Sequence, residues 1–265
     1  MQIKIRFRAL SQLLCLGGCL LACLPALSAS EGAAAEAARF ERFPAMETKG
    51  LEDERLVRVL EDFYQANYGG ADNWAKVESI RFDGQLHRPG GSIPFTAYKK
   101  KPNYCKIIVR PGAERRVIMS YDGEDAWQLD TGAADPRPAS MSEKEALNFI
   151  RNAATGSHLL HPTLPGKSIT LGSTIEVDGA MCREIDVSLP GGLSITYVLN
   201  VGNHAERQQI SVNAVNGDRE VTTHYAYTKI EDIVFPTGSI LRVDGEEIHR
   251  IEVEEVTLNA GLMPW

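Results

Sequence analysis

The sequence predicts an α+β protein that is mainly antiparallel β. We expect a strongly curved, half-open barrel of about ten or eleven strands, with helices covering its concave face. Long stretches of the chain alternate apolar and polar residues, which is the period of a strand with one buried face. Short turn sequences such as Asp178-Gly179 and Asp244-Gly245 separate these stretches, so neighbouring strands are expected to be antiparallel. Only two segments show the 3.6-residue period of amphipathic helices.

The first thirty residues predict a secretory signal peptide. Lys4, Arg6 and Arg8 form a cationic start, residues 10–24 are almost wholly apolar, and the small residues of Ala26–Ser30 suit cleavage. The protein is therefore expected to be exported.

An alternative cleavage stays open. Leu20-Leu21-Ala22-Cys23 resembles a bacterial lipobox, which would make the chain an outer-membrane lipoprotein anchored through Cys23. In either case we expect residues 31–50 to form a flexible lead-in and residues 51–265 to form one domain, because no linker divides them.

The first helix is predicted from Leu51 to Tyr68, and Gly69-Gly70 ends it. The second is predicted from Ser142 to Ala154, where Ser142 and Glu145 have the spacing of a capping box. Both helices are expected to act as a lid whose apolar residues face the sheet. These lid residues are Leu56, Leu60, Phe63, Leu147 and Ile150.

The strands form a meander that the second helix interrupts once. Alternation runs over 77–87, 93–97, 104–110, 117–121 and 126–129 before this helix, and over 169–171, 174–177, 181–189, 193–199, 221–227 and 248–253 after it. A sheet of this length must curl. Full closure would leave the helices nothing to cover, so the barrel is expected to stay half open.

The composition is that of a folded protein. The 265 residues are 43% hydrophobic and 24% charged, which excludes a long disordered chain. Beyond the N-terminus no apolar stretch reaches the roughly 18 residues of a membrane span. The formal net charge of −7 argues against a nucleic-acid partner, because phosphate binding needs a basic surface.

The chain lacks the motifs of common enzymes and metal sites. Gly-x-Ser-x-Gly, His-Glu-x-x-His, a P-loop and Gly-x-Gly-x-x-Gly are all absent, so we expect no enzymatic activity. His158 and His161 lie in a proline-containing loop, which favours ordinary loop histidines over metal ligands. No metal and no cofactor are expected. Four further histidines are expected to be solvated on polar strand faces: His87, His204, His224 and His249.

Two cysteines, Cys105 and Cys182, follow the predicted signal peptide. They could form a disulfide in an oxidising compartment, but two cysteines are not a disulfide framework. Two separate, half-buried thiols are the favoured alternative.

Residues on the inward registers of the strands are candidates for lining a cavity. They either fill the core or surround an apolar space beneath the helices, and the sequence leaves both alternatives open. The candidates are Phe82, Phe95, Ile107, Val109, Met119, Tyr121, Trp127, Ile195, Tyr197, Tyr225 and Tyr227.

Several motifs follow one another in a familiar order along residues 51–265. They are the helix ending in Tyr68-Gly69-Gly70, the segment 74–84, Lys101-Pro102-Asn103-Tyr104, the segment 121–127, and the closing segments 227–236 and 251–262. This order resembles the bacterial outer-membrane lipoprotein-sorting proteins.

The resemblance implies a LolA/LolB-like fold, in which helices form a lid over a hydrophobic cavity in a half-open barrel. It implies a monomeric periplasmic carrier that shelters lipid or lipoprotein acyl chains and exchanges them with a membrane-bound donor or acceptor protein. The alternative is an envelope lipid or stress sensor, or a scaffold, with the same fold and no transfer activity.

Overall fold

The computed structural model describes residues 44–261. The predicted signal peptide, with Cys23, and residues 31–43 of the lead-in lie outside the described residues. The described strands are β1 (Ser79–Arg88), β2 (Gly91–Lys100), β3 (Tyr104–Val109), β4 (Val117–Tyr121), β5 (Ala126–Asp130), β6 (Ala139–Ser140), β7 (Ser168–Val177), β8 (Ala180–Ser188), β9 (Ser194–Asn200), β10 (Glu206–Val212), β11 (Arg219–Ile230), β12 (Ile233–Val243) and β13 (Glu246–Leu258).

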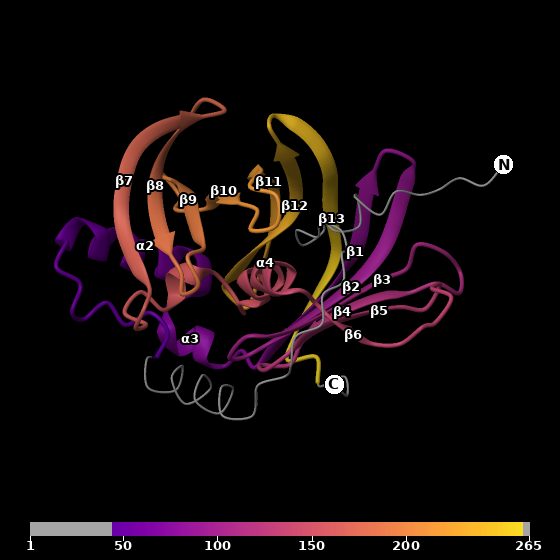
Figure 1. Ribbon diagram of the computed structural model, residues 1–265. Helices are drawn as coiled ribbons and strands as arrows, with labels where there is room; N and C mark the ends of the chain where they lie inside the picture. The colour runs from indigo at the N-terminus through magenta and orange to yellow at the C-terminus, as the bar shows by residue number, and fades with distance from the viewer. Residues whose placement is uncertain (1–43, 262–265) are drawn as a thin grey trace.

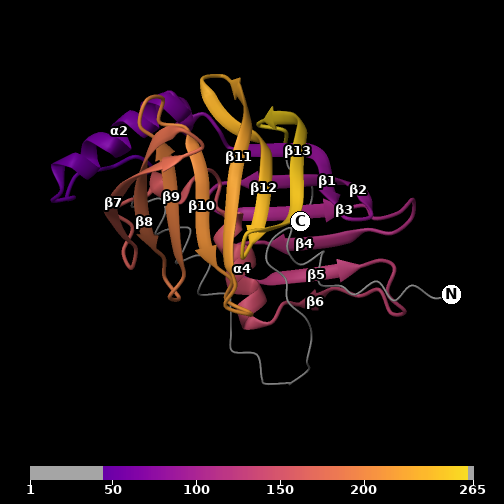
Figure 2. The ribbon, with the colours of Figure 1, turned by 90° about the horizontal axis from the view of Figure 1, so that it is seen from above.

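These strands form one antiparallel sheet of two meanders. The strand order is β6-β5-β4-β3-β2-β1-β13-β12-β11-β10-β9-β8-β7, so β1 pairs with β13 and joins the two meanders. Strands β6 and β7 remain as edges, and the sheet is therefore not closed. It curves strongly around the helix α4 (Glu143–Ala153), as Figure 1 shows. Viewed from above, the strands of the first meander run across the direction of β8–β12 (Figure 2).

The helices begin and end with the signals that the sequence carries. Helix α2 (Glu54–Tyr68) is capped by the Asp53 side chain and ends at Gly69, which adopts a left-handed conformation with φ 67°. Helix α4 begins at the predicted capping box, because Ser142 and Glu145 each bond the other's backbone. A short helix α3 (Ala71–Ala75) follows α2, and a 3₁₀ turn at His158–Leu160 lies in the segment expected to be a loop.

Each of the two longer helices covers its own apolar core. Leu56, Leu60 and Phe63 of α2 pack against inward residues of β7–β9 and β12, among them Ile185 and Tyr197. Helix α4 covers β1–β5 instead. Its Phe149 is fully buried in a second cluster with Met119, Tyr121 and Val109. Phe82 contacts both clusters, so the two cores meet at β1.

The sheet has thirteen strands, so the expected count of ten or eleven was too low. Strand β6 contains only two residues, which is too short for a recognisable alternation. In the second meander, β-bulges interrupt the period of two, for example between Glu206 and Gln208 and between His224 and Ala226. The runs 169–171 and 174–177, expected to be separate, are one strand with a bulge between Leu171 and Thr174.

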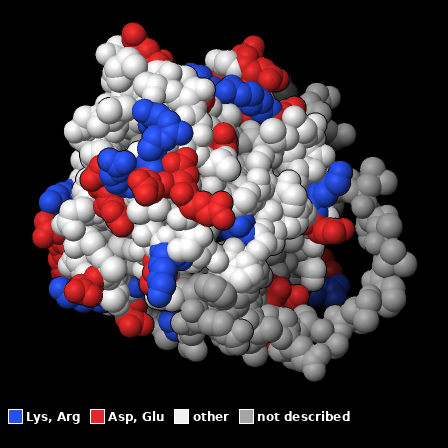
Figure 3. All heavy atoms as spheres, turned by 90° about the vertical axis from the view of Figure 1, so that its left-hand side faces the viewer, with Lys and Arg blue, Asp and Glu red and all other residues white. Residues whose placement is uncertain are grey.

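No helix among residues 44–261 is long and apolar enough to cross a membrane. Figure 3 shows the face on the β7 and β8 side of the molecule, where acidic and basic side chains lie interspersed among uncharged ones.

The contact between β1 and β13 leaves no room for a side chain at Gly84. A Cβ atom there would overlap the carbonyl oxygen of Glu252 and lie 2.9 Å from Cα of Val253. Both atoms belong to the backbone of β13 and cannot rotate away. We therefore expect Gly84→Ala to lower the free energy of unfolding by about 1–3 kcal/mol, the usual cost of overpacking. Urea denaturation measures this change.

Gly112→Ala is the matched control, because a Cβ atom at this position would have no neighbouring atom within 4 Å. It is expected to change stability by less than about 0.5 kcal/mol. Equal stabilities of the two variants would show that the junction of the meanders is not tightly packed.

Candidate functional site

A cavity of about 360 Å³ lies between the concave face of the sheet and the C-terminal end of α4. Strands β1–β3 and β9–β13 form its walls, and Arg151 to His158 form its roof. Tyr68, the last residue of α2, and Trp74 of α3 also contribute to the lining. This volume lies near the lower end of the range for small-molecule sites, about 300–1,000 Å³.

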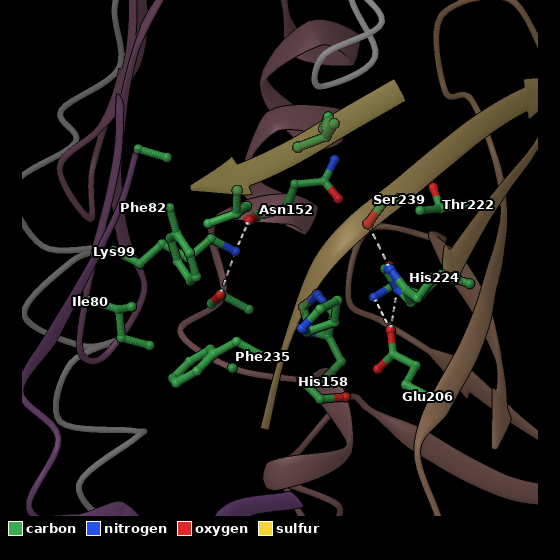
Figure 4. A pocket seen from close by; sticks show the side chains of 18 of the residues that line it. Ile80, Phe82, Lys99, Asn152, His158, Glu206, Thr222, His224, Phe235 and Ser239 are labelled. Atoms are coloured by element: carbon green, nitrogen blue, oxygen red, sulfur yellow. Dashed lines mark hydrogen bonds and ion pairs between the residues drawn. The ribbon is translucent and has the colours of Figure 1, made fainter. Parts of the chain in front are cut away.

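One side of the cavity is apolar. Phe82 of β1 and Phe235 of β12 meet edge to face with their ring centroids 5.9 Å apart. Their neighbours on this side come from β1, β2 and β3, and Figure 4 shows Ile80, Phe82 and Phe235 together. The apolar lining of this part of the cavity consists of Ile80, Phe82, Phe95, Ala97, Ile107 and Phe235.

The structure brings together some of the residues predicted to line a cavity, and places others elsewhere. Phe82, Phe95, Ile107, Ile195 and Tyr197 line the cavity. Three further candidates, Val109, Met119 and Tyr121, are buried in the core beneath α4, where Phe149 occupies the space. The alternative of a filled core therefore describes these three positions.

The last three aromatic candidates do not line the cavity. In the β5 register Ala126 and Gln128 share the inward face with Met119, so Trp127 projects from the opposite face. Tyr225 is 43% exposed and stacks near Arg250, because Thr222 and His224 line the cavity and alternation places Tyr225 on the opposite face. The Tyr227 hydroxyl instead donates to the backbone carbonyls of Glu206 and His224.

The residues predicted to form the lid lie on the two helices as expected. Leu56, Leu60 and Phe63 are buried beneath α2. Ile150 is partly buried against the core under α4. Leu147 reaches toward the β8–β9 turn, since a Cβ at Gly191 would lie 3.2 Å from its Cδ2. Helix α4 therefore extends from the first meander to the second.

The floor of the cavity is polar, which the sequence analysis did not predict. His224 and His249 were expected to be solvated, but they are only 6% and 4% exposed and line the cavity. The other polar floor residues come from β10, β11 and β12. They are Glu206, Gln209, Ser211, Glu220, Thr222 and Ser239. Alternation in β10–β13 shows which residues share a face of the sheet. Both faces of these strands carry polar residues, so the sequence did not show which face lines the cavity.

Three floor residues form a hydrogen-bonded chain (Figure 4). The Nδ1 atom of His224 lies 2.8 Å from Oγ of Ser239, and its Nε2 atom lies 3.1 Å from Oε1 of Glu206. Gln209 donates to the same carboxylate oxygen, so the side chain of Glu206 is held in place.

A serine, a histidine and a carboxylate in this order also occur in hydrolases, where free backbone N–H groups stabilise the oxyanion. Ser239 instead lies inside β12, which pairs with β11 on one side and β13 on the other. We interpret the hydrogen bonds between Ser239, His224 and Glu206 as a network that satisfies buried polar groups.

A second polar network holds α4 to the β10–β11 hairpin. Nη2 of Arg151 lies 3.3 Å from Oε2 of Glu220, and both side chains are almost fully buried. Asn148 of α4 donates to Asn213, which donates in turn to Glu220 at 2.8 Å. Arg151 also donates to the carbonyl of Val212. Helix α4 is therefore fixed over the floor by polar contacts.

Lysine side chains hold the segment that follows α4. Nζ of Lys99 donates to the carbonyls of Asn152 and Ala154, at the helix end where a cation is favoured. Lys167 donates to the carbonyls of His158 and His161, and burial lowers its pKa to about 8. Burial also lowers the pKa of Lys99.

Buried groups from α2, β9 and this segment form the end of the cavity near Trp74. Burial, followed by the nearby charge of Lys167, lowers the pKa of His158 to about 3, and the imidazole bonds the carbonyl of Arg151. The backbone N–H groups of Ser157 and His158 donate to the hydroxyls of Tyr68 and Tyr197. These contacts connect the segment that follows α4 to both helices.

Cys105 and Cys182 are free and buried, on β3 and β8. The disulfide alternative is therefore not formed, since seven strands of the sheet separate β3 from β8. Burial raises the pKa of Cys105 to about 11. Among residues 44–261 no three His, Cys, Asp or Glu side chains are grouped so that they could hold a metal ion.

The buried ion pair provides a test of how α4 is held. Glu220→Gln leaves the Arg151 charge uncompensated in the interior, which should lower the free energy of unfolding by about 3–5 kcal/mol. Amide exchange in α4 should accelerate, because the helix loses its main polar anchor. Urea denaturation and hydrogen exchange measure the two effects.

Asp135→Asn is the matched control, because Asp135 pairs with Arg137 at the surface. The Asp135 side chain is 62% exposed and the Arg137 side chain 79%. An exposed pair contributes about 0–1 kcal/mol. If both substitutions had the same small effect, the buried pair would not anchor the helix.

No protein-family model matches the chain, and no curated protein matches it. Its fold does match solved structures. An outer-membrane lipoprotein-sorting protein domain from Vibrio parahaemolyticus has a TM-score of 0.54 at 8% identity, over 78% of this chain and 93% of that one. A DUF1329 family protein from Desulfovibrio piger has a TM-score of 0.54 at 13% identity, and the match covers 80% of this chain and 96% of that one.

A LolA superfamily protein from Nitrosomonas europaea has a TM-score of 0.52 at 14% identity, and the match covers 77% of this chain and 94% of that chain. At these identities the likeness is one of fold. The half-open barrel described here is thus the fold of the LolA superfamily and of lipoprotein-sorting domains.

Proposed function

We propose that the protein is a periplasmic binding or carrier protein that shelters the acyl chain of a lipid or lipoprotein in its cavity. The observation that carries this proposal is the partly apolar cavity that α4 covers in a half-open, LolA-like barrel. Burying an acyl chain against this lining gains about 0.8 kcal/mol for each methylene group. The apolar side of the cavity suits such a chain better than a compact polar metabolite.

The proposed mechanism is passive and involves no chemical change in the cargo. Helix α4 lies across the cavity and is held by side-chain contacts, chiefly those of Arg151 and Asn148. Displacement of the helix would open the cavity toward a membrane-bound donor or acceptor protein. Ser239 lies inside β12, which pairs with a neighbouring strand on each side, and this position supports a non-enzymatic role.

The N-terminal sequence supports the periplasmic assignment. Residues 1–30 have the layout of a signal peptide, and Cys23 offers the alternative of an outer-membrane anchor. We propose that the exported protein acts as a monomer.

Filling the cavity tests the proposal. Ala97 lines the cavity, and its register neighbours are Phe82 and Ile107. A tryptophan at this position would occupy the apolar space, so Ala97→Trp should weaken binding of the apolar fluorophore N-phenylnaphthylamine by about tenfold or more. Fluorescence titration of the protein purified after export measures the affinity.

Ala113→Trp is the control, because Ala113 lies in an exposed turn. It should bind the fluorophore like the unchanged protein, and circular dichroism should show that both variants are folded. Lipid extracted after incubation should be recovered intact. Absence of fluorophore binding, equal binding by both variants, or release of hydrolysed lipid would contradict the proposal.

A further inference from the structure

One histidine on the cavity floor has an open hydrogen-bonding position. His249 of β13 is 4% exposed, and its Nδ1 atom is enclosed without a hydrogen-bond partner among the described residues. Buried polar groups in native proteins are nearly always satisfied, and each exception calls for an explanation. Because His249 lines the cavity, a bound molecule is in a position to supply the partner.

The surroundings of His249 distinguish it from its neighbour on the floor. In the sheet register His249 lies opposite Leu241, which lies opposite Thr222, and all three line the cavity. His224 on the adjacent row has both ring nitrogens bonded, to Ser239 and Glu206. The network around His224 is therefore complete within the protein, whereas His249 remains available.

The chemistry of His249 favours an uncharged partner. Burial lowers its pKa to about 4, so at neutral pH the ring has one N–H donor and one acceptor nitrogen. Such a ring bonds a hydroxyl or a carbonyl group well. An anion would enter a floor that already holds the carboxylates of Glu206 and Glu220.

The lysine and arginine side chains that line the cavity are already engaged. Arg151 is paired with Glu220, and Lys99 bonds two carbonyls at the end of α4. A carboxylate or phosphate on the ligand would therefore have to displace contacts that hold the helix. Burying an uncompensated charge is costly, which argues further for an uncharged polar group.

We infer that the cavity takes a neutral, single-chain lipid whose hydroxyl or carbonyl group bonds His249 while its chain lies along the apolar lining. This inference rests on the proposed function and specifies the chemistry of the cargo. The cavity volume of about 360 Å³ suits one chain better than the several chains of a multiply acylated molecule.

Competition between ligands of equal chain length tests the inference. Dodecanol and dodecane are each used to displace N-phenylnaphthylamine from the full exported protein, and the ratio of the two displacing concentrations is measured. Dodecanoate serves as the anionic comparison. His249→Leu should shift the dodecanol-to-dodecane ratio by about tenfold against dodecanol, the ratio expected for one lost neutral hydrogen bond.

Two further variants separate a hydrogen bond from a change in packing. His249→Asn keeps a polar group and should retain most of the preference for dodecanol. His87→Leu should leave the ratio unchanged, because His87 bonds Ser92 and Glu252 on the outer face. In nitrogen NMR spectra of the unchanged protein, dodecanol should shift the imidazole signals of His249 and leave those of His87 in place.

The outcomes separate this inference from the proposed function. If the fluorophore binds and the ratio is the same in His249→Leu and in the unchanged protein, the inference is wrong and the carrier proposal stands. Stronger displacement by dodecanoate than by dodecanol would also overturn it, in favour of an anionic head group. If the fluorophore does not bind at all, both proposals fail together.

Discussion

The pairing of β1 with β13 is the interaction on which the rest of the structure depends. It joins the first and last strands of the chain's sheet, so two meanders become one curved surface with β6 and β7 as distant edges. The chain must cross from one edge to the other between β6 and β7, and α4 lies in that crossing. The covered concavity therefore follows from the order of the strands. Gly84 allows the two backbones to approach closely at this junction.

The cavity persists because α4 is attached to the two halves of the sheet in different ways. Toward the first meander, Phe149 packs into an apolar core with Met119. Toward the second, Arg151 and Asn148 make polar contacts with the β10–β11 hairpin. These polar contacts fix the position of α4 over the sheet and leave the cavity beneath the helix unfilled. The same polar strands form the cavity floor, so one surface both positions α4 and lines the cavity.

Much of the fold could be predicted from local sequence, because helix periods, caps and turns are local properties. Asp53 was not identified as a cap, but the capping box at Ser142 and the helix end at Gly69 were. The site was harder to predict. Alternation shows that His224 and Thr222 share a face, but polarity suggested that this face was solvated. At Trp127 and at Tyr225 the sequence could not show which of two neighbouring residues points inward.

The central claim is that the space beneath α4 is a binding site for a lipid chain. Native mass spectrometry of the protein, released gently from the cells that produce it, tests this claim most directly. The account predicts a folded species whose mass exceeds that of the polypeptide by one lipid molecule, and that loses this mass on collisional activation. A folded protein that is consistently found at the polypeptide mass, even after incubation with lipid, would contradict it.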